Sequence, residues 1–192
     1  MAKPEMIPVY ETALEQADLS VLSGKAVNLQ ELRDYGFVVL RIRPDSAGAA
    51  AALTQLGLEL PPALGMTGSL DSRLVKWISP DEYLITLPLS AKDAFIREAT
   101  TALEGVFSAV VDNSGAYSLL KLSGEHALDL LSKLTFYDVR GKLPVGKVVS
   151  TQMSKAPVIF YRLDDDALML MLRWSFADYA WKIMHIAAEE YL

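Results

Sequence analysis

The order of secondary-structure signals occurs twice along this chain, at a nearly constant spacing. Phe37, in an apolar run, matches Tyr117 about 80 residues later, and Ser90, before a helical pattern, matches Ser175 about 85 residues later. Each half has the pattern strand, helix, hairpin, helix. This repeat predicts an internal duplication, in which two similar αβ units bury their apolar faces.

Turn and capping residues set the expected boundaries in the first half. Pro44 ends a β-rich run, and Asp45 or Ser46 is placed to cap the following helix, which Gly57 would end. Ser90 opens a Ser-x-x-Asp pattern typical of a capping box. The elements expected are a strand at 35–44, a helix at 45–57, a hairpin at 73–88 turning at 79–82, and a helix at 90–105.

The second half repeats these signals. One or two strands are expected at 110–124 around 113–115, then a helix at 125–134, a hairpin at 156–174 turning at 164–166, and a final helix that begins at Ser175. In that hairpin Leu168, Leu170 and Leu172 alternate with Met169 and Met171. Both sets are apolar, so the hairpin is predicted to be buried on both faces.

These patterns predict an α+β fold of mainly antiparallel sheets, each with helices on one face. Residues 1–34 are expected to form an N-terminal arm, in which 27–32 is either one helical turn or a short strand. Residues 35–108 and 109–192 are the two expected αβ repeats, which share strands or pack together as one compact unit.

Composition excludes several partners. A net charge of -6 and a pI near 4.9 argue against nucleic acid and anionic membranes. The chain has no cysteine, no run long enough to span a bilayer and no apolar stretch typical of a signal peptide near its start, so a cytoplasmic location is expected. Its mean hydropathy of +0.23 is high, which indicates either a large core or apolar surface kept for a partner.

No constellation typical of catalysis is visible. The two histidines, His126 and His185, lack further ligands at metal-binding spacing and are interpreted as ordinary helix residues. The acidic run at 164–166 is where a hairpin must turn, so a hydrated turn is favoured over a cation site. Phosphate-cradling glycine motifs and nucleophile elbows are absent. We therefore predict no catalytic, cofactor-binding or metal-binding residue.

Polar residues next to buried strands suggest an interface instead. Asp112 and Asn113, next to Ser114, are interpreted as turn caps, because no histidine lies nearby in the sequence to act as a base for a serine nucleophile. Arg173 needs an anionic partner, and Asp112, Asp178 and a group on another chain all remain open. The final helix is apolar on almost every side, so one side is expected to face a partner. The interface candidates are Asp112, Arg173, Trp174, Tyr179, Trp181 and Met184.

Four stretches resemble the gamma subunit family of heterotetrameric sarcosine oxidases. They are Trp77–Ile85 (WISPDEYLI), Val110–Leu134, Leu143–Arg162 and Leu172–Trp181, whose Arg-x-Ser-Phe-Ala element is the most specific. More distantly, the run from Asp112 resembles the aminomethyltransferase family, the folate-binding T-protein of glycine cleavage. Folate-active members carry an acid in a Gly-Gly-x-x-Asp-type strand, whereas the matching strand here (SKAPVIFYR) has none.

The resemblance implies an aminomethyltransferase-like scaffold without the folate-active group, inside a larger complex. It implies alpha, beta and delta subunits as partners, with FAD, FMN, NAD and zinc held by those partners and none by this chain. The complex would demethylate sarcosine oxidatively to glycine and pass the one-carbon unit to tetrahydrofolate. This chain would be a non-catalytic gamma subunit. The alternative is a stand-alone folate-binding or aminomethyltransferase-like protein that uses Asp112, Tyr161 and Arg173.

Overall fold

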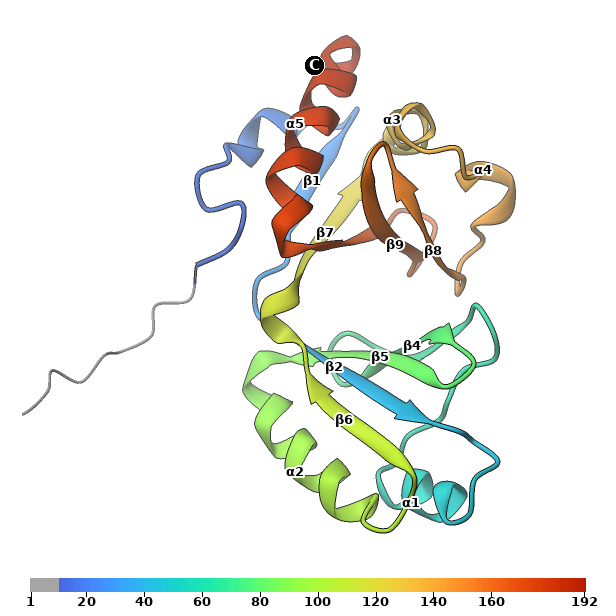
Figure 1. Cartoon of the computed structure of the whole chain (residues 1–192). Helices are drawn as coiled ribbons and strands as arrows, with labels where there is room; N and C mark the ends of the chain where they lie inside the picture. Colours follow the sequence, from blue (N-terminus) through green and yellow to red (C-terminus); the bar gives the residue numbers. More distant parts are fainter. Residues whose placement is uncertain (1–10) are drawn as a thin grey trace, which may run out of the picture.

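Two antiparallel five-stranded sheets pack face to face, with helices on their outer sides (Figure 1). This computed structural model describes residues 11–192; the first part of the predicted arm, including the stretch used to argue against a signal peptide, lies outside them. The first sheet has the order β3-β4-β5-β2-β6, and the second has the order β1-β7-β10-β9-β8. The α+β prediction is confirmed.

The first sheet and its helices match the expected elements closely. The hairpin turns between 79 and 82, as predicted, and the short β3 was not anticipated. The elements are β2 (Tyr35–Ile42), α1 (Ala49–Gln55), β3 (Met66–Gly68), β4 (Leu74–Ser79), β5 (Glu82–Pro88), α2 (Lys92–Ala102) and β6 (Ser108–Asp112).

The second sheet has an equivalent set of elements. The segment predicted as a helical turn or a strand is a strand, β1 (Asn28–Glu31), and it follows a short 3-10 helix, Leu19–Leu22. The remaining elements are β7 (Tyr117–Ser123), α3 (Ala127–Leu134), α4 (Val139–Lys142), β8 (Val148–Met153), β9 (Ala156–Arg162), β10 (Leu168–Arg173) and α5 (Ala177–Ala188). Neither α4 nor β8 was anticipated.

The two halves exchange their edge strands. β1 directly precedes β2 in the chain but pairs with β7, and β6 directly precedes β7 but pairs with β2. At the crossings, the Leu32 N–H donates to the Leu119 carbonyl and the Asn113 N–H donates to the Phe37 carbonyl, both at 2.8 Å. The predicted arm therefore supplies a strand to the second sheet, and the halves share strands.

These matching hydrogen bonds define which residues are equivalent in the two halves. Phe37 corresponds to Leu119, and the first residues of β2 and β7, Tyr35 and Tyr117, correspond to each other. The match of Phe37 with Tyr117 inferred from sequence is therefore wrong by two residues. Both are aromatic residues near the start of a strand, so the sequence alone did not distinguish them.

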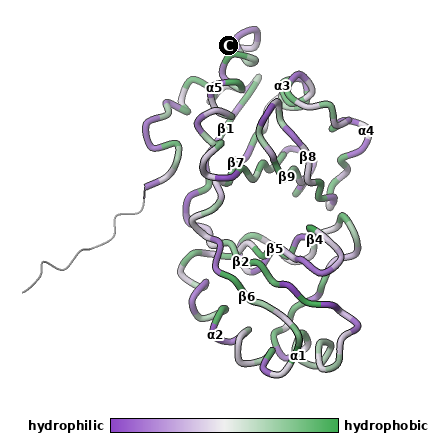
Figure 2. The backbone as a smooth tube through the Cα atoms, viewed as in Figure 1, coloured by the Kyte–Doolittle hydropathy of each residue, from purple (hydrophilic) through white to green (hydrophobic). Residues whose placement is uncertain are grey.

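Three apolar cores hold the four layers together. One lies between the second sheet and α3 and α5, one lies between the first sheet and α1 and α2, and the third lies between the sheets. In β10, Leu170 faces the helices, whereas Met169 and Met171 face the first sheet. The prediction of a hairpin buried on both faces is confirmed. Figure 2 shows the hydrophobic stretches along the strands of both sheets.

No predicted serine or aspartate caps a helix. α2 begins at Lys92 after a 3-10 turn from Leu89, and α5 begins at Ala177 after a similar turn from Trp174. The Lys92 N–H donates to the Leu89 carbonyl, and the Ala177 N–H donates to the Trp174 carbonyl. A backbone carbonyl of the 3-10 turn therefore takes the place of the predicted side-chain cap at the first N–H of each helix. α1 begins after Gly48, whose φ of +80° favours glycine.

The last helix has one buried stripe rather than an apolar surface on all sides. Trp181 and Met184 face the chain's own core, with exposures of 7% and 0%, whereas Asp178 and Lys182 face outward and Ile186 is 65% exposed. Most of its apolar side chains are covered by the second sheet, α3 and the segment before β1. Within residues 11–192, no helix has both the length and the apolarity needed to span a membrane.

Candidate functional site

The two crossings between the sheets border a cleft of about 460 Å³, which we call the crossover cleft. Its walls come from both halves at equivalent positions. Tyr35 and Leu89 belong to the first half, and Tyr117 and Trp174 belong to the second. The remaining lining residues are Glu11, Thr12, Glu15, Glu31, Leu32, Arg33, Asp34, Phe37, Ser114, Gly115, Ser118 and Leu119.

One equivalent carboxylate lies at each crossing, and each is already held by a cation. Glu31 is 4% exposed and accepts hydrogen bonds from Arg33 Nε at 2.8 Å and from Thr12 Oγ1 at 3.1 Å. Arg33 also pairs with Glu15 at 3.0 Å. These contacts tie the segment before β1 to the crossing.

Asp112 is the corresponding carboxylate at the second crossing. Burial alone would raise its pKa, but hydrogen bonds from Lys92 and Ser114 outweigh burial and lower the pKa below its ordinary value. Ser114 in turn accepts a hydrogen bond from the Phe37 N–H at 3.1 Å. The interpretation of Asp112 as a turn cap is therefore confirmed, since it also accepts from the Ser114 N–H at 3.0 Å.

Arg173 lies next to the cleft but pairs with neither intrachain candidate. Its guanidinium lies 4.5 Å from the centre of the Tyr117 ring, a cation–π contact. Asp112 is taken by Lys92, and Asp178 pairs with Lys182 at 2.7 Å. Within residues 11–192 Arg173 forms no ion pair, so a group on another chain is the predicted partner that remains.

The other interface candidates differ in how much surface they offer. Trp174 is 48% exposed on the rim of the cleft. The Tyr179 hydroxyl lies 2.9 Å from Ser154 Oγ, and the side chain is only partly exposed. Trp181 stacks on His185 at 5.3 Å, and Met184 is fully buried. This burial removes Trp181 and Met184 from the predicted contact surface.

A buried polar pair between the sheets escaped the sequence prediction. Lys76 is 0% exposed and forms no ion pair in the described chain; its Nζ lies 2.5 Å from Thr86 Oγ1 and 5.1 Å from the centre of the Tyr161 ring. Desolvation lowers the pKa of Lys76 to about 7. Burial raises the pKa of Tyr161, whose hydroxyl has no hydrogen-bond partner among the described residues. The sequence did contain a signal for this burial, because Lys76 alternates with Leu74 and Ile78 and so shares their apolar face of the strand.

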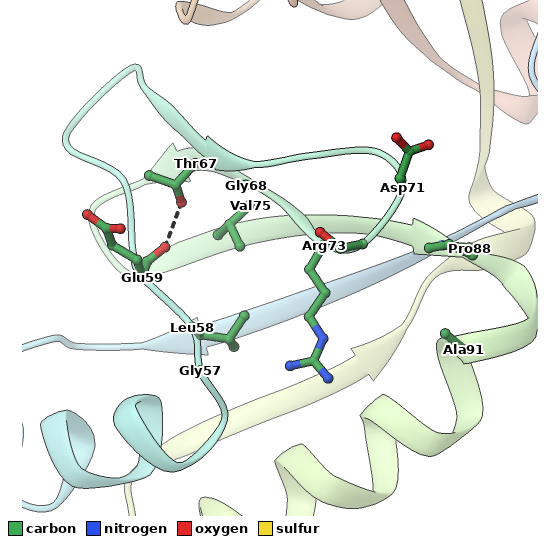
Figure 3. Close-up of a pocket in the computed structure, with 11 residues that line it drawn as sticks. Gly57, Leu58, Glu59, Thr67, Gly68, Asp71, Arg73, Val75, Pro88 and Ala91 are labelled. Atoms are coloured by element: carbon green, nitrogen blue, oxygen red, sulfur yellow. Dashed lines mark hydrogen bonds between the residues drawn. The ribbon is translucent and has the colours of Figure 1, made fainter.

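A second cleft, near the end of α1, has its arginine fully engaged. Arg73 points between α1 and α2 (Figure 3). It donates to the Leu56 carbonyl at 2.7 Å, lies 3.4 Å from Glu98 and stacks 4.8 Å from the centre of the Phe95 ring. These contacts close the end of α1, so this arginine has a structural role.

The histidines and the acidic run have local partners, although His126 directly precedes α3 rather than lying within it. His126 lies 3.0 Å from Asp129 and stacks on Tyr191 at 4.7 Å. Asp164 accepts from the Asp166 N–H at 2.9 Å, which forms the expected turn. Among residues 11–192, no three histidine or acidic side chains are grouped so that they could hold a metal ion.

Comparison with known proteins decides the family. The model of the sarcosine oxidase gamma subunit family matches residues 43–190. The chain belongs to this family. The gamma subunit of sarcosine oxidase from Corynebacterium sp. (strain P-1) is 29% identical over 180 residues, covering 91% of this chain and 88% of that protein. The Arthrobacter sp. gamma subunit is 31% identical over 156 residues, covering 80% and 76%.

Solved structures agree with the family. A chain of heterotetrameric sarcosine oxidase from Corynebacterium sp. U-96, in complex with pyrrole 2-carboxylate, matches with a TM-score of 0.85 and 25% identity over 95% of this chain and 96% of that one. Aminomethyltransferase T of the Bartonella henselae glycine cleavage system matches with a TM-score of 0.65 and 13% identity, over 85% of this chain and 46% of that one. The second likeness shows a shared fold, as the sequence predicted.

The gamma-subunit chain does not bring together the three residues of the folate alternative. Tyr161 is buried between the sheets, Asp112 is bound to Lys92, and Arg173 rests on Tyr117. None of the three lines the crossover cleft.

Proposed function

We propose that this chain is the gamma subunit of a heterotetrameric sarcosine oxidase and supports assembly of the flavin-bearing subunits rather than catalysing a step itself. The observation that carries the proposal is the match to a chain of such an enzyme over 95% of this chain and 96% of that one. The reaction of the whole complex would be oxidative demethylation of sarcosine to glycine, with the one-carbon unit passed to tetrahydrofolate. The alpha, beta and delta subunits would hold FAD, FMN, NAD and zinc.

The state of the ionisable groups supports an assembly role. A general base or nucleophile must be free to reach a reacting atom. In the crossover cleft Glu31 is paired with Arg33, and at its edge Asp112 is paired with Lys92. Lys76, whose pKa would suit proton transfer near neutral pH, is closed off between the two sheets. The pairs of Glu31 and Asp112 hold the two crossings together, and Lys76 is shielded from any substrate.

The surface supports the same role. Permanent interfaces are more apolar than ordinary surface and contain aromatic anchors. Large apolar side chains with at least 48% exposure are spread over both halves: Phe107, Val111, Phe136, Val145, Trp174, Ile186 and Leu192. Arg173 adds a cation whose intrachain candidates are both taken.

Co-expression tests the proposal. The alpha, beta and delta subunits from the same source are produced with and without this chain, carrying an affinity tag. We expect the tagged chain to co-elute with flavin absorbance at the size of a heterotetramer, and we expect the other subunits produced without it to yield less assembled flavoprotein. Separate elution of the tagged chain, with unchanged assembly of the others, would contradict the proposal.

A further inference from the structure

The two edge strands that the halves exchange are equivalent in position but not in their surroundings. At the outer edge of β1, the Val27 carbonyl accepts a hydrogen bond from the Gly24 N–H at 3.0 Å, and Ser23 bridges to Asn28. Leu14 and Leu22, from the segment before β1, share a buried core with Leu29 of the same strand. The chain's own N-terminal segment therefore covers this edge.

β6 has no such cover among the described residues. It pairs with β2 on one side, and no other described strand pairs with it. Because the Asn113 N–H bonds to Phe37, alternate residues of β6 turn their backbone groups toward β2 and the others turn theirs outward. The N–H and C=O groups of Ser108, Val110 and Asp112 therefore face the open edge. Open edges of this kind pair readily with another strand.

The side chains beside this edge are apolar where the equivalent ones on β1 are polar. Phe107 is 87% exposed, Val111 is 49% exposed, and Ala109 is exposed between them. On β1 the residues equivalent to Ala109 and Val111 are Asn28 and Gln30. At these equivalent positions, the side chains are therefore polar on β1 and apolar on β6. Natural sheets protect open edges with charges or proline, and β6 has neither before Asp112.

Two arginines lie at the Phe107 end of the β6 edge. A hollow of about 380 Å³ lies beside Phe107 and is bordered by Arg41 and Arg43. Arg41 pairs with Asp81 at 3.0 Å, whereas Arg43 is exposed and forms no ion pair within residues 11–192. A carboxylate is the group that complements a free guanidinium.

We propose that β6 accepts an extended segment of another subunit of the oxidase as an additional strand of the first sheet. The inference rests on the proposed function and names the surface that it uses. The segment hydrogen-bonds to the outward backbone groups of β6, places an apolar side chain against Phe107 and Val111, and directs a carboxylate to Arg43. This mode of recognition takes affinity from the backbone and specificity from the side chains.

A matched pair of variants tests the docking edge. Val111→Lys puts a charge on the proposed contact, and Gln30→Lys puts the same charge at the equivalent position of the covered edge. In competition with unmodified chain during co-expression, we expect Val111→Lys to enter the complex about tenfold less and Gln30→Lys to enter equally well. Equal incorporation of both variants, or equal loss of both, would overturn the proposal.

Two further variants distinguish loss of docking from loss of folding. Phe107→Ser changes a side chain that is 87% exposed, so the isolated chain should keep its thermal midpoint while incorporation falls. Arg43→Glu should also reduce incorporation, and unchanged incorporation would refute the carboxylate contact. A chain that joins the complex normally with all of these changes refutes the docking edge but leaves the proposed function standing. A dimer of the isolated chain that Val111→Lys dissolves would make a second copy the occupant instead.

Discussion

The two halves of this molecule have the same strand order, yet they fill equivalent positions with different chemistry. Lys76 lies opposite Leu84 in the first sheet, and Tyr161 lies opposite Met169 in the second. Leu84 pairs with Val39, Met169 pairs with Lys121, and these partners are equivalent, so Lys76 and Tyr161 occupy the same place in the two halves. They meet each other between the sheets.

The duplicated scaffold therefore fixes backbone positions and leaves side chains free to diverge. The two halves differ at the centre between the sheets and at the exchanged edges. At the centre the difference leaves a buried lysine with no ion-pair partner within residues 11–192. At the edges it leaves β6 apolar and open while β1 is covered. Four pairs of variants, each with a member at or near an equivalent or neighbouring position, measure how far these differences matter for stability.

The largest effect is expected at Lys76. Burial lowers its pKa in the folded chain to about 7, from 10.5 in the unfolded chain, so the unfolded chain binds more protons between these values. The free energy of unfolding should therefore rise with pH from about 7 to about 10.5, by about 5 kcal/mol at most. The double variant Lys76→Met, Thr86→Val should be more stable than the natural chain at neutral pH and should lose this rise.

Urea unfolding at a series of pH values measures the effect. The single variant Thr86→Val is the control, because it keeps the cation and should keep the slope. A double variant whose stability varies with pH as steeply as that of the natural chain would show that burial does not lower the pKa of Lys76.

The second effect compares two faces of α5. Met184→Ala removes a fully buried side chain and should lower the free energy of unfolding by about 3 kcal/mol. Ile186→Ala, two residues along on the exposed face, should change it by less than about 0.5 kcal/mol. Thermal or urea unfolding of both variants distinguishes them. Similar losses would mean that the outer face is also packed in the isolated chain.

The third effect compares the two equivalent carboxylates. Glu31→Gln breaks a nearly buried pair and should cost about 2 kcal/mol. Asp112→Asn affects a carboxylate that is 42% exposed, where solvent screens the pair, and should cost less than about 1 kcal/mol. The lowered pKa of Asp112 means that its small contribution is present above the ordinary value of 3.8 and lost as pH falls below it. A larger loss of stability for Asp112→Asn than for Glu31→Gln would contradict the conclusion that the Glu31 pair is the more stabilising of the two.

The smallest effect is expected at Tyr161. Its buried hydroxyl has no partner in the described chain, so Tyr161→Phe removes an uncompensated polar group and should stabilise the fold by about 1 kcal/mol. Tyr117→Phe, at the cleft wall, serves as the comparison and should be close to neutral. A loss of stability on Tyr161→Phe would indicate that the hydroxyl has a bound partner.

Sequence reasoning predicted the repeated elements, both hairpin turns and the burial of the β9–β10 hairpin, because these depend on local periodicity and turn residues. The exchange of β1 and β6 could not be derived, since a short strand carries no signal of which sheet it joins. Capping by Ser90 and Ser175 was wrong because 3-10 turns supplied backbone acceptors instead.

The candidate site was predicted only in part. Arg173 and Trp174 lie at or beside the crossover cleft, as their position between a strand and a helix suggested. Trp181 and Met184 were chosen from the apolarity of the last helix, but that apolarity serves the helix's own packing. Phe107 and the open edge of β6 were missed, because exposure of an edge depends on the exchanged topology.

Amide hydrogen exchange of the two edge strands, in the isolated chain and in the assembled complex, shows whether β6 is left open for another subunit. The outward amides of Ser108, Val110 and Asp112 in β6 should exchange rapidly in the isolated chain and slow by about a hundredfold or more on assembly, while β1 changes little. Exchange in β6 that is already slow in the isolated chain, or that stays the same on assembly, would contradict the claim that this edge is left for another subunit.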